Sequence, residues 1–209
     1  MKKIFKTIVL FALCAVCSLS LLTSCKKSTD DIKAPAGFSV CTSDVADCYF
    51  FYPMSVWLPS ESAGFLSLVK ADHSEDNSSV VLNSWEVEVP LGSSADSYMS
   101  LKEYWNGIPK SEGLDGVQSF DGYVKTLSEL INGYAVVSDE EIKVGDHDAY
   151  SVVYTGDIAG AKIKVKQVCI AVAKGNHTKV YCFTYTSTPD SYDYNIQAVN
   201  SMIDSFSLK

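Results

Sequence analysis

The sequence predicts an α+β fold, a single layered domain in which a largely antiparallel sheet carries helices after its fourth strand and at the C-terminus. Three observations predict it. Residues 79–89 alternate between two faces in the way of a half-buried strand. Residues 134–186 hold four apolar segments separated by short Gly-containing turns, which indicates an antiparallel meander. An amphipathic helix closes the chain.

Four strands are expected before the first helix. Residues 38–41 and 48–52 predict a hairpin, because they are short β-branched and aromatic segments on either side of a polar turn. Residues 64–71 and 79–89 predict a second strand pair. In the last of these strands Val81, Asn83, Trp85, Val87 and Val89 share one face.

Two helices are expected between the fourth strand and the meander. The first is capped by Ser93 or Ser94 and ends before Gly107. Its apolar positions are Tyr98, Leu101 and Trp105. The second ends at Asn132-Gly133. Its apolar stripe is Val117, Phe120, Val124, Leu127 and Ile131.

The meander predicts strands at residues 134–144, 148–156, 161–173 and 178–186. The last turn, Gly175-Asn176, has the composition of a two-residue hairpin loop. A turn centred there places Cys169 directly opposite Cys182, within reach of a disulfide bond.

Cys41 and Cys48 flank the first hairpin turn and could form a second disulfide. Four cysteines in an exported domain are typical of disulfide bonding, and free buried thiols are the alternative.

The final helix has the clearest signals. Thr188 is its predicted N-cap and Pro189 its first residue. The apolar stripe that follows is Tyr192, Ile196, Val199, Ile203 and Phe206.

The N-terminus predicts a lipoprotein signal peptide over residues 1–24. Three lysines precede an apolar run at residues 8–22, which is shorter than a membrane-spanning helix needs. The run ends in Leu22-Thr23-Ser24-Cys25, which resembles the bacterial lipobox. Cys25 is therefore the expected lipid attachment site, and residues 26–36 are a polar tether. The alternatives are an ordinary secretory peptide with a chance cysteine and an uncleaved anchor.

The charge of the chain limits its partners. The 209 residues carry 25 acidic side chains and 17 lysines with no arginine, for a net charge of −8. Loss of the leader removes three lysines and no acid, so the mature chain is more acidic still. Nucleic acid and anionic lipid surfaces are therefore disfavoured as partners.

Several short motifs in residues 37–209 resemble the PsbP-like family. They are Tyr52-Pro53-x-x-x-Trp57, Gly145-x-x-x-Ala149-Tyr150 with Tyr154-Thr155-Gly156, Val180-Tyr181-x-Phe183-Thr184-Tyr185 and Ser205-Phe206-x-Leu208. The resemblance implies an α/β/α sandwich and a family that includes many bacterial lipoproteins. None of these motifs contains a catalytic residue, so the resemblance bears on fold more than on function.

The sequence contains no recognisable catalytic, phosphate-binding or dinucleotide-binding motif. Residues 72–76 and 146–148 combine His73 and His147 with carboxylates, and we interpret both as solvated turns, not metal sites. No cofactor is expected. An aromatic binding face over Tyr98, Tyr104 and Trp105 is the alternative to a core role for these side chains.

These observations favour a lipid-anchored accessory or binding module without catalytic activity, on the extracytoplasmic face of a bacterial membrane. Its expected partners are the membrane lipid attached through Cys25 and a membrane or surface protein complex. The alternative is an extracytoplasmic hydrolase with an unrecognised active site.

Overall fold

The computed structural model describes residues 32–209 except 45, 63–64, 72–76 and 109–119. The large sheet is built from β3 (Trp57–Ser62), β4 (Phe65–Lys70), β5 (Ser79–Val87), β8 (Asn132–Val144), β9 (His147–Ile158), β10 (Ala161–Lys174) and β11 (His177–Ser187). A smaller sheet contains β1 (Phe38–Ser43), β2 (Cys48–Pro53) and β12 (Ser207–Leu208). The helices are α2 (Leu101–Asn106), α3 (Tyr123–Leu130) and α4 (Tyr192–Asp204), and β6 (Gly107–Ile108) pairs with β7 (Phe120–Asp121).

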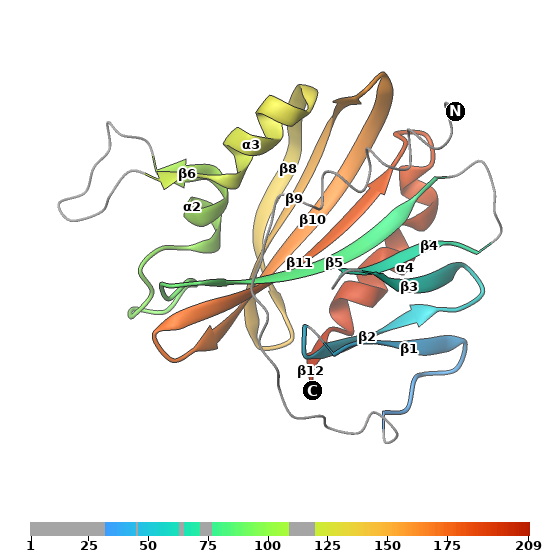
Figure 1. The fold of residues 1–209 in the computed structure, drawn as a ribbon, viewed down its shortest axis with the longest axis horizontal. Helices are drawn as coiled ribbons and strands as arrows, with labels where there is room; N and C mark the ends of the chain where they lie inside the picture. Colours follow the sequence, from blue (N-terminus) through green and yellow to red (C-terminus); the bar gives the residue numbers. More distant parts are fainter. Residues whose placement is uncertain (1–31, 45, 63–64, 72–76, 109–119) are drawn as a thin grey trace.

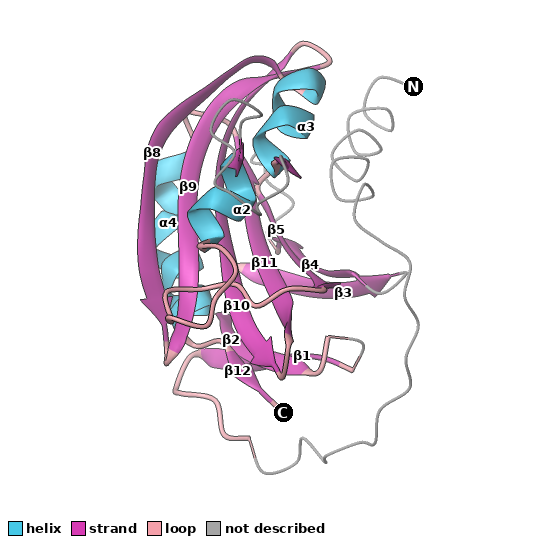
Figure 2. Cartoon of the chain, turned by 90° about the vertical axis from the view of Figure 1, so that its left-hand side faces the viewer, coloured by secondary structure: helices cyan, strands magenta, loops and turns pink. Residues whose placement is uncertain are grey.

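The large sheet has the strand order β3-β4-β5-β11-β10-β9-β8, and each neighbouring pair is antiparallel (Figure 1). Helix α4 lies on one side of this sheet, and α2 and α3 lie on the other (Figure 2). The small sheet, in the order β1-β2-β12, packs beside α4. This arrangement confirms the predicted layered α+β fold.

Two hydrophobic cores follow from the two covered faces. Alternate residues of β10 belong to different cores, with Val168 and Ile170 on the α4 side and Cys169 and Ala171 on the α2–α3 side. A central strand that is buried on both faces has a nearly continuous apolar sequence, and β10 has one from Val168 to Ala173.

In the described part of the chain, five strands, not four, precede helix α2. Strand β3 was not predicted, because Pro59 interrupts the segment and its polar residues hide the alternation. The strand is at the edge of the sheet, where a proline is tolerated because one side of the backbone needs no partner. Trp57 anchors it, with no exposed surface and an edge-on contact to Tyr185 at 6.5 Å between ring centroids.

Helix α2 begins later than predicted. Its N-cap is Ser100, whose side chain accepts a hydrogen bond from the Glu103 backbone N–H, while the Glu103 side chain accepts one from the Ser100 N–H. This reciprocal capping box stabilises the start of the helix, so the predicted caps Ser93 and Ser94 lie in the preceding loop. The predicted end at Gly107 is confirmed.

Helix α3 is shorter than the stripe predicted. Gly122 is its N-cap, and Phe120 belongs to β7 instead of the helix. A Cβ atom on Gly122 would lie 2.0 Å from the Gly107 backbone nitrogen, so a glycine here allows α3 to start against the end of α2. Val117 lies outside the described residues.

The predicted meander is confirmed, and so is its register. Lys174 faces His177 across the turn, which places Ile170 opposite Tyr181 and Val172 opposite Lys179. Gly175 has φ of 66°, a left-handed conformation that suits glycine in this type of turn.

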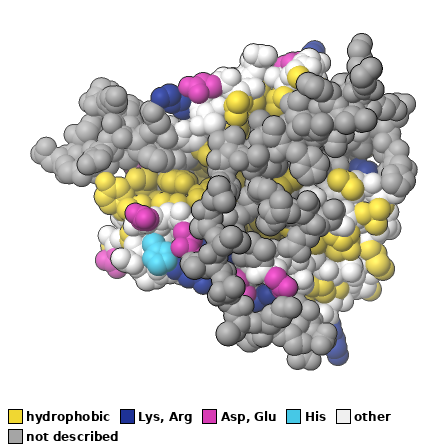
Figure 3. All heavy atoms as spheres, in the orientation of Figure 1, with side chains coloured by type: hydrophobic (Ala, Val, Ile, Leu, Met, Phe, Trp, Pro, Cys, Tyr) yellow, Lys and Arg dark blue, Asp and Glu magenta, His cyan; other side chains and the backbone are white. Residues whose placement is uncertain are grey.

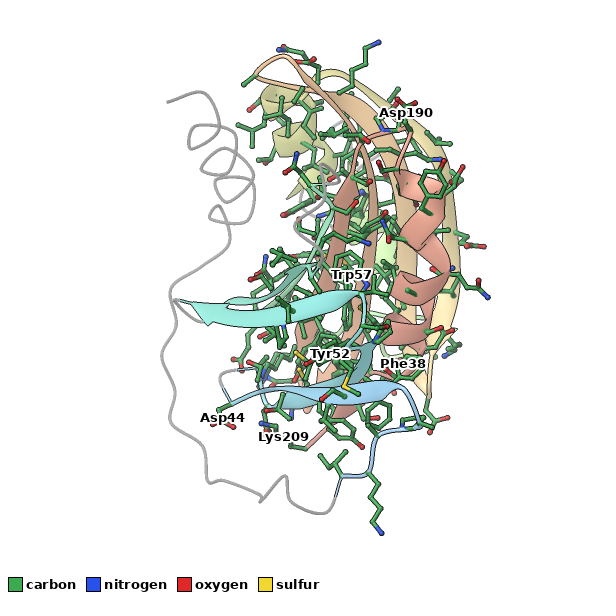
Figure 4. All side chains as sticks on the ribbon, turned by 90° about the vertical axis from the view of Figure 1, so that its right-hand side faces the viewer. Phe38, Asp44, Tyr52, Trp57, Asp190 and Lys209 are labelled. Atoms are coloured by element: carbon green, nitrogen blue, oxygen red, sulfur yellow. The ribbon has the colours of Figure 1, made fainter. Side chains whose placement is uncertain are left out.

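Helix α4 begins at Tyr192 with Ser191 as its N-cap, three residues after the predicted cap. The backbone carbonyl of Thr188 nevertheless accepts hydrogen bonds from the N–H groups of Ser191 and Tyr192. A turn therefore precedes the regular helix. After the helix the chain pairs with β2, and Lys209 Nζ reaches Asp44 Oδ1 at 2.8 Å (Figure 4).

The predicted signal peptide, Cys25 and the first part of the predicted tether lie outside the described residues. Among the helices that are described, none has both the length and the apolar character that crossing a membrane requires.

Candidate ligand-binding groove

A shallow groove lies on the α2–α3 side of the large sheet, with an enclosed volume of about 20 Å³ and an open part that is continuous with solvent. Its side of the sheet faces the viewer in Figure 1. The lining residues come from β5, β9, β10, β11 and α3, and they are Ser79, Val81, Asn83, Trp85, Tyr123, Ile158, Gln167, Cys182, Thr184 and Thr186.

Strand register brings the polar floor together. On β5 and β11 every second residue points to the same face, and three facing pairs line the groove. These pairs are Ser79 with Thr186, Val81 with Thr184, and Asn83 with Cys182. Gln167 of β10 lies next to Thr184 on the other side. The floor is therefore a row of uncharged hydroxyl and amide groups.

Hydrogen bonds fix the middle of this floor. The Tyr154 hydroxyl donates to Gln167 Oε1 at 3.0 Å, and Gln167 Nε2 donates to Thr184 Oγ1 at 3.0 Å. Because Gln167 is only 3% exposed, these two bonds determine how its amide is oriented. Asn83 differs, since its Oδ1 atom is buried and has no hydrogen-bond partner among the described residues.

Aromatic side chains form one end of the groove. The Trp85 and Tyr123 rings are parallel within 6°, with centroids 6.3 Å apart, and Tyr123 packs against Trp105 at 4.7 Å. Trp85 Nε1 also donates to the Tyr104 hydroxyl at 2.9 Å. The indole of Trp85 is therefore held in one orientation by groups on both helices.

The aromatic residues singled out from the sequence have different roles. Trp105 is 1% exposed and belongs to the core, whereas Tyr104 holds Trp85 at the groove. Tyr98 is 45% exposed and does not line the groove.

Sheet residues next to the groove are apolar and exposed. Val69 of β4 is directly opposite Ser79, and Leu58 of β3 is opposite Val69, so all three share one face. Leu58 and Val69 are 45% and 44% exposed. Apolar side chains also show at the right of Figure 3, on the side where β3 and β4 lie in Figure 1.

The cysteines of the meander are placed as predicted. Cys169 and Cys182 face each other across β10 and β11, and both are 2% exposed. The structure joins none of the four described cysteines in a disulfide bond, so an oxidised pair stays a prediction.

The cysteines of the first hairpin do not face each other. Cys41 is opposite Phe50 and Cys48 is opposite Ser43, so the two thiols are diagonal neighbours on one face. Burial raises the pKa of Cys48 to about 12. Diagonal positions lie about 7–8 Å apart, beyond the usual range of a disulfide bond.

Of the two histidine-containing turns, only residues 146–148 lie in the described part of the chain. His147 packs edge-on against Phe206 at 6.5 Å, and its neighbour Asp148 binds Ser93 and Lys143. His73 lies outside the described residues. Within the described ranges, no group of three potential ligands is close enough to hold a metal ion.

The sequence predicts the strand face that carries the groove but not the groove itself. Asn83 and Gln167 were the available signal, since both interrupt apolar faces of strands at inward positions. The missing information was which strands are neighbours, because β5 pairs with β11 across a gap of about 90 residues along the chain.

Comparisons with known proteins bear on the fold. No family model matches the sequence, and no curated protein matches it. Among solved structures, the chain is similar to LpqN, a protein involved in cell envelope biogenesis of Mycobacterium tuberculosis. The TM-score is 0.52 at 15% identity, and the alignment covers 78% of this chain and 83% of LpqN.

Two further structures are similar at lower scores. Cyanobacterial PsbP from Synechocystis has a TM-score of 0.47 at 16% identity, over 90% of this chain and 99% of its own. The Ran-binding protein Mog1p of Saccharomyces cerevisiae has 0.49 at 12% identity, over 82% and 95%. At these identities, only the likeness to LpqN is close enough to support a shared fold. Membership of the PsbP-like family stays a prediction.

Proposed function

We propose that this chain is a lipid-anchored, extracytoplasmic accessory or binding module without catalytic activity, and that it holds its ligand in the groove beside α3. The groove is the observation that carries this proposal. It combines a fixed aromatic end with buried uncharged polar groups, which is the usual composition of a small-ligand site.

The unpartnered oxygen of Asn83 supports a binding role. A buried carbonyl oxygen without a hydrogen bond costs about 1–3 kcal/mol, and a ligand that donates to it recovers part of this cost. The surrounding groups are already ordered by the sheet and by α2 and α3. Binding would therefore require little reorganisation of the protein.

The N-terminal sequence supports the location. The lipobox-like Leu22-Thr23-Ser24-Cys25 follows a leader-like apolar run, and residues 26–36 are long enough to hold the domain away from the membrane surface. A lipid-anchored domain with a surface groove would meet ligands outside the cytoplasm.

Photo-crosslinking in living cells tests whether the groove is occupied. A benzophenone side chain is placed at Val69, which neighbours Ser79 at the groove, and for comparison at Tyr194, which is 85% exposed on α4 across the sheet. We expect a discrete adduct from position 69 and not from position 194. The same pattern from both positions, or no adduct from position 69, would contradict a ligand in the groove.

An activity screen tests the non-catalytic part of the proposal. The exported protein is assayed against esterase, peptidase and glycosidase substrates, and we expect no turnover above that of a heat-unfolded sample. Turnover that a single substitution abolishes would favour the hydrolase alternative.

A further inference from the structure

We propose that the groove binds an uncharged saccharide, with a sugar ring against Trp85 and its hydroxyl groups bonded to the amide and hydroxyl side chains of the floor. This inference rests on the proposed binding function and adds the chemical class of the ligand. Three properties of the lining support it.

The first property is the absence of charge. None of the ten described residues that line the groove carries a charged side chain at neutral pH. A phosphate, carboxylate or ammonium group that entered would lose water without gaining an opposite charge, which is costly. The lining therefore favours a neutral ligand.

The second property is the polarity of the floor. Ser79, Thr184 and Thr186 are each less than 10% exposed, and their hydroxyls both donate and accept hydrogen bonds. Asn83 adds an amide whose oxygen has no partner. An alkyl chain laid over these groups would remove water without replacing its hydrogen bonds. Hydroxyl groups of a ligand can replace them, because they also donate and accept.

The third property is a flat apolar surface beside this polar row. Trp85 is held by Tyr123 and Tyr104, and Val81 and Ile158 complete the apolar part of the lining. A pyranose ring has a C–H face and a rim of hydroxyls. One face of such a ring can contact an aromatic side chain while its rim reaches the floor, so the ligand and the groove match in their distribution of polar and apolar groups.

The test uses the full-length protein, exported, lipid-anchored and solubilised in a detergent without a sugar headgroup. Immobilised neutral oligosaccharides of glucose, mannose, xylose and N-acetylglucosamine are compared with uronate-containing and sulfated ones of similar length. Nucleosides and an alkyl alcohol series serve as neutral ligands of other classes. Dissociation constants of the ligands that bind are then measured by calorimetry.

We expect binding of at least one neutral oligosaccharide and weaker or no binding of its acidic counterparts. Trp85→Ala and Asn83→Ala should each weaken it about tenfold or more. Thr186→Val, which keeps the side-chain shape, should weaken it several-fold, and Trp85→Phe should retain most of it. Tyr194→Ala is the matched control on α4 and should leave the dissociation constant unchanged.

The outcomes separate this inference from the proposed function. If nucleosides, alkyl alcohols or acidic oligosaccharides bind in a manner that depends on Trp85, the saccharide inference is wrong and a binding groove stands. If no saccharide binds, the inference is also wrong, and the adduct at position 69 decides the proposed function by itself. If saccharide binding is unaffected by Trp85→Ala, Asn83→Ala and Thr186→Val in folded protein, the groove is not its site.

Discussion

Asp148 joins the loop before α2 to the edge of the meander. Its carboxylate accepts a hydrogen bond from the Ser93 backbone N–H at 2.8 Å and others from the Ser93 hydroxyl and Lys143 Nζ. Gly92 allows this approach, because its φ is 138° and a Cβ there would lie 2.6 Å from Asp148 Oδ2. The sequence indicated only a solvated acidic turn at this position.

The pKa of Asp148 makes this contact sensitive to pH. Burial raises the pKa, but the hydrogen bonds from Lys143 and Ser93 lower it by more, so it lies below the ordinary 3.8. A lowered pKa in the folded state means that the ionised carboxylate stabilises the fold above pH 3.8, and that this contribution is lost as pH falls through the folded-state pKa.

We therefore predict that Asp148→Asn lowers the free energy of unfolding by about 1 kcal/mol at pH 7. The difference from the wild type should vanish below the folded-state pKa. Urea denaturation of both proteins, at pH 7 and at a pH below the folded-state pKa, measures this difference in the free energy of unfolding. Asp193→Asn is the control, since that side chain is 82% exposed and lies 3.5 Å from Lys164. Equal destabilisation by Asp148→Asn at both pH values would contradict the electrostatic explanation.

The two cysteine pairs should respond differently to oxidation. Cys169 and Cys182 face each other directly, whereas Cys41 and Cys48 are diagonal. We predict that the exported protein, unfolded without reductant and treated with a thiol reagent, is labelled at Cys41 and Cys48 only. Closing the loop from Cys169 to Cys182 should stabilise the domain by roughly 3 kcal/mol. Labelling of all four cysteines would contradict the prediction, because it would show that Cys169 and Cys182 face each other but do not form a disulfide bond.

At the scale of the elements, the N-cap of α2 was predicted at the wrong serine. Several serines precede the helix, and spacing alone does not tell which of them is the cap. The capping box at Ser100 and Glu103 is the correct signal, and it was present in the sequence as the Ser-x-x-Glu pattern.

We predict that Ser100→Ala lowers the free energy of unfolding by about 1 kcal/mol, because it removes the acceptor for the Glu103 N–H. Ser94→Ala, at a cap position expected from the sequence, should change it by less than about 0.5 kcal/mol. Urea denaturation of the two variants distinguishes them. A larger destabilisation by Ser94→Ala than by Ser100→Ala would contradict this prediction and indicate that Ser94 is the N-cap.

The edge strand β3 could not be predicted from its own residues. Its sequence gives little evidence for a strand, and it is fixed by the burial of Trp57 against Tyr185 and by pairing with β4. Strand propensity depends on such neighbours more than on the residues themselves.

At the scale of the whole molecule, the N-terminal anchor is the prediction with the largest consequence. Cys25→Ala should prevent lipid transfer, so the protein should leave the membrane fraction or remain unprocessed. Fractionation of cells that express the two forms, followed by mass measurement of the N-terminus, checks this. Ser28→Ala, in the predicted tether and outside the lipobox-like motif, serves as the processing control. Unchanged processing and membrane retention of Cys25→Ala would exclude lipidation at this residue.

The two sides of the large sheet have different coverings. Helix α4 and the small sheet cover one side with an aromatic core that includes Phe50, Phe183 and Phe206. On the other side α2 and α3 cover the sheet beside the groove. Because these short helices cover only part of the sheet, polar residues such as Thr184 and Thr186 form the floor of the groove instead of a core.

The sequence by itself determined the meander, its register across Gly175-Asn176, the final helix and the α+β class. These depend on local turn chemistry and on hydrophobic periodicity, which neighbouring residues encode. Tertiary structure decided the edge strand β3, the start of α2, and the groove. In each case contacts between residues distant along the chain set the outcome, as in the pairing of Asn83 with Cys182. Such pairings depend on strand order, which the turn and periodicity signals of one chain do not specify.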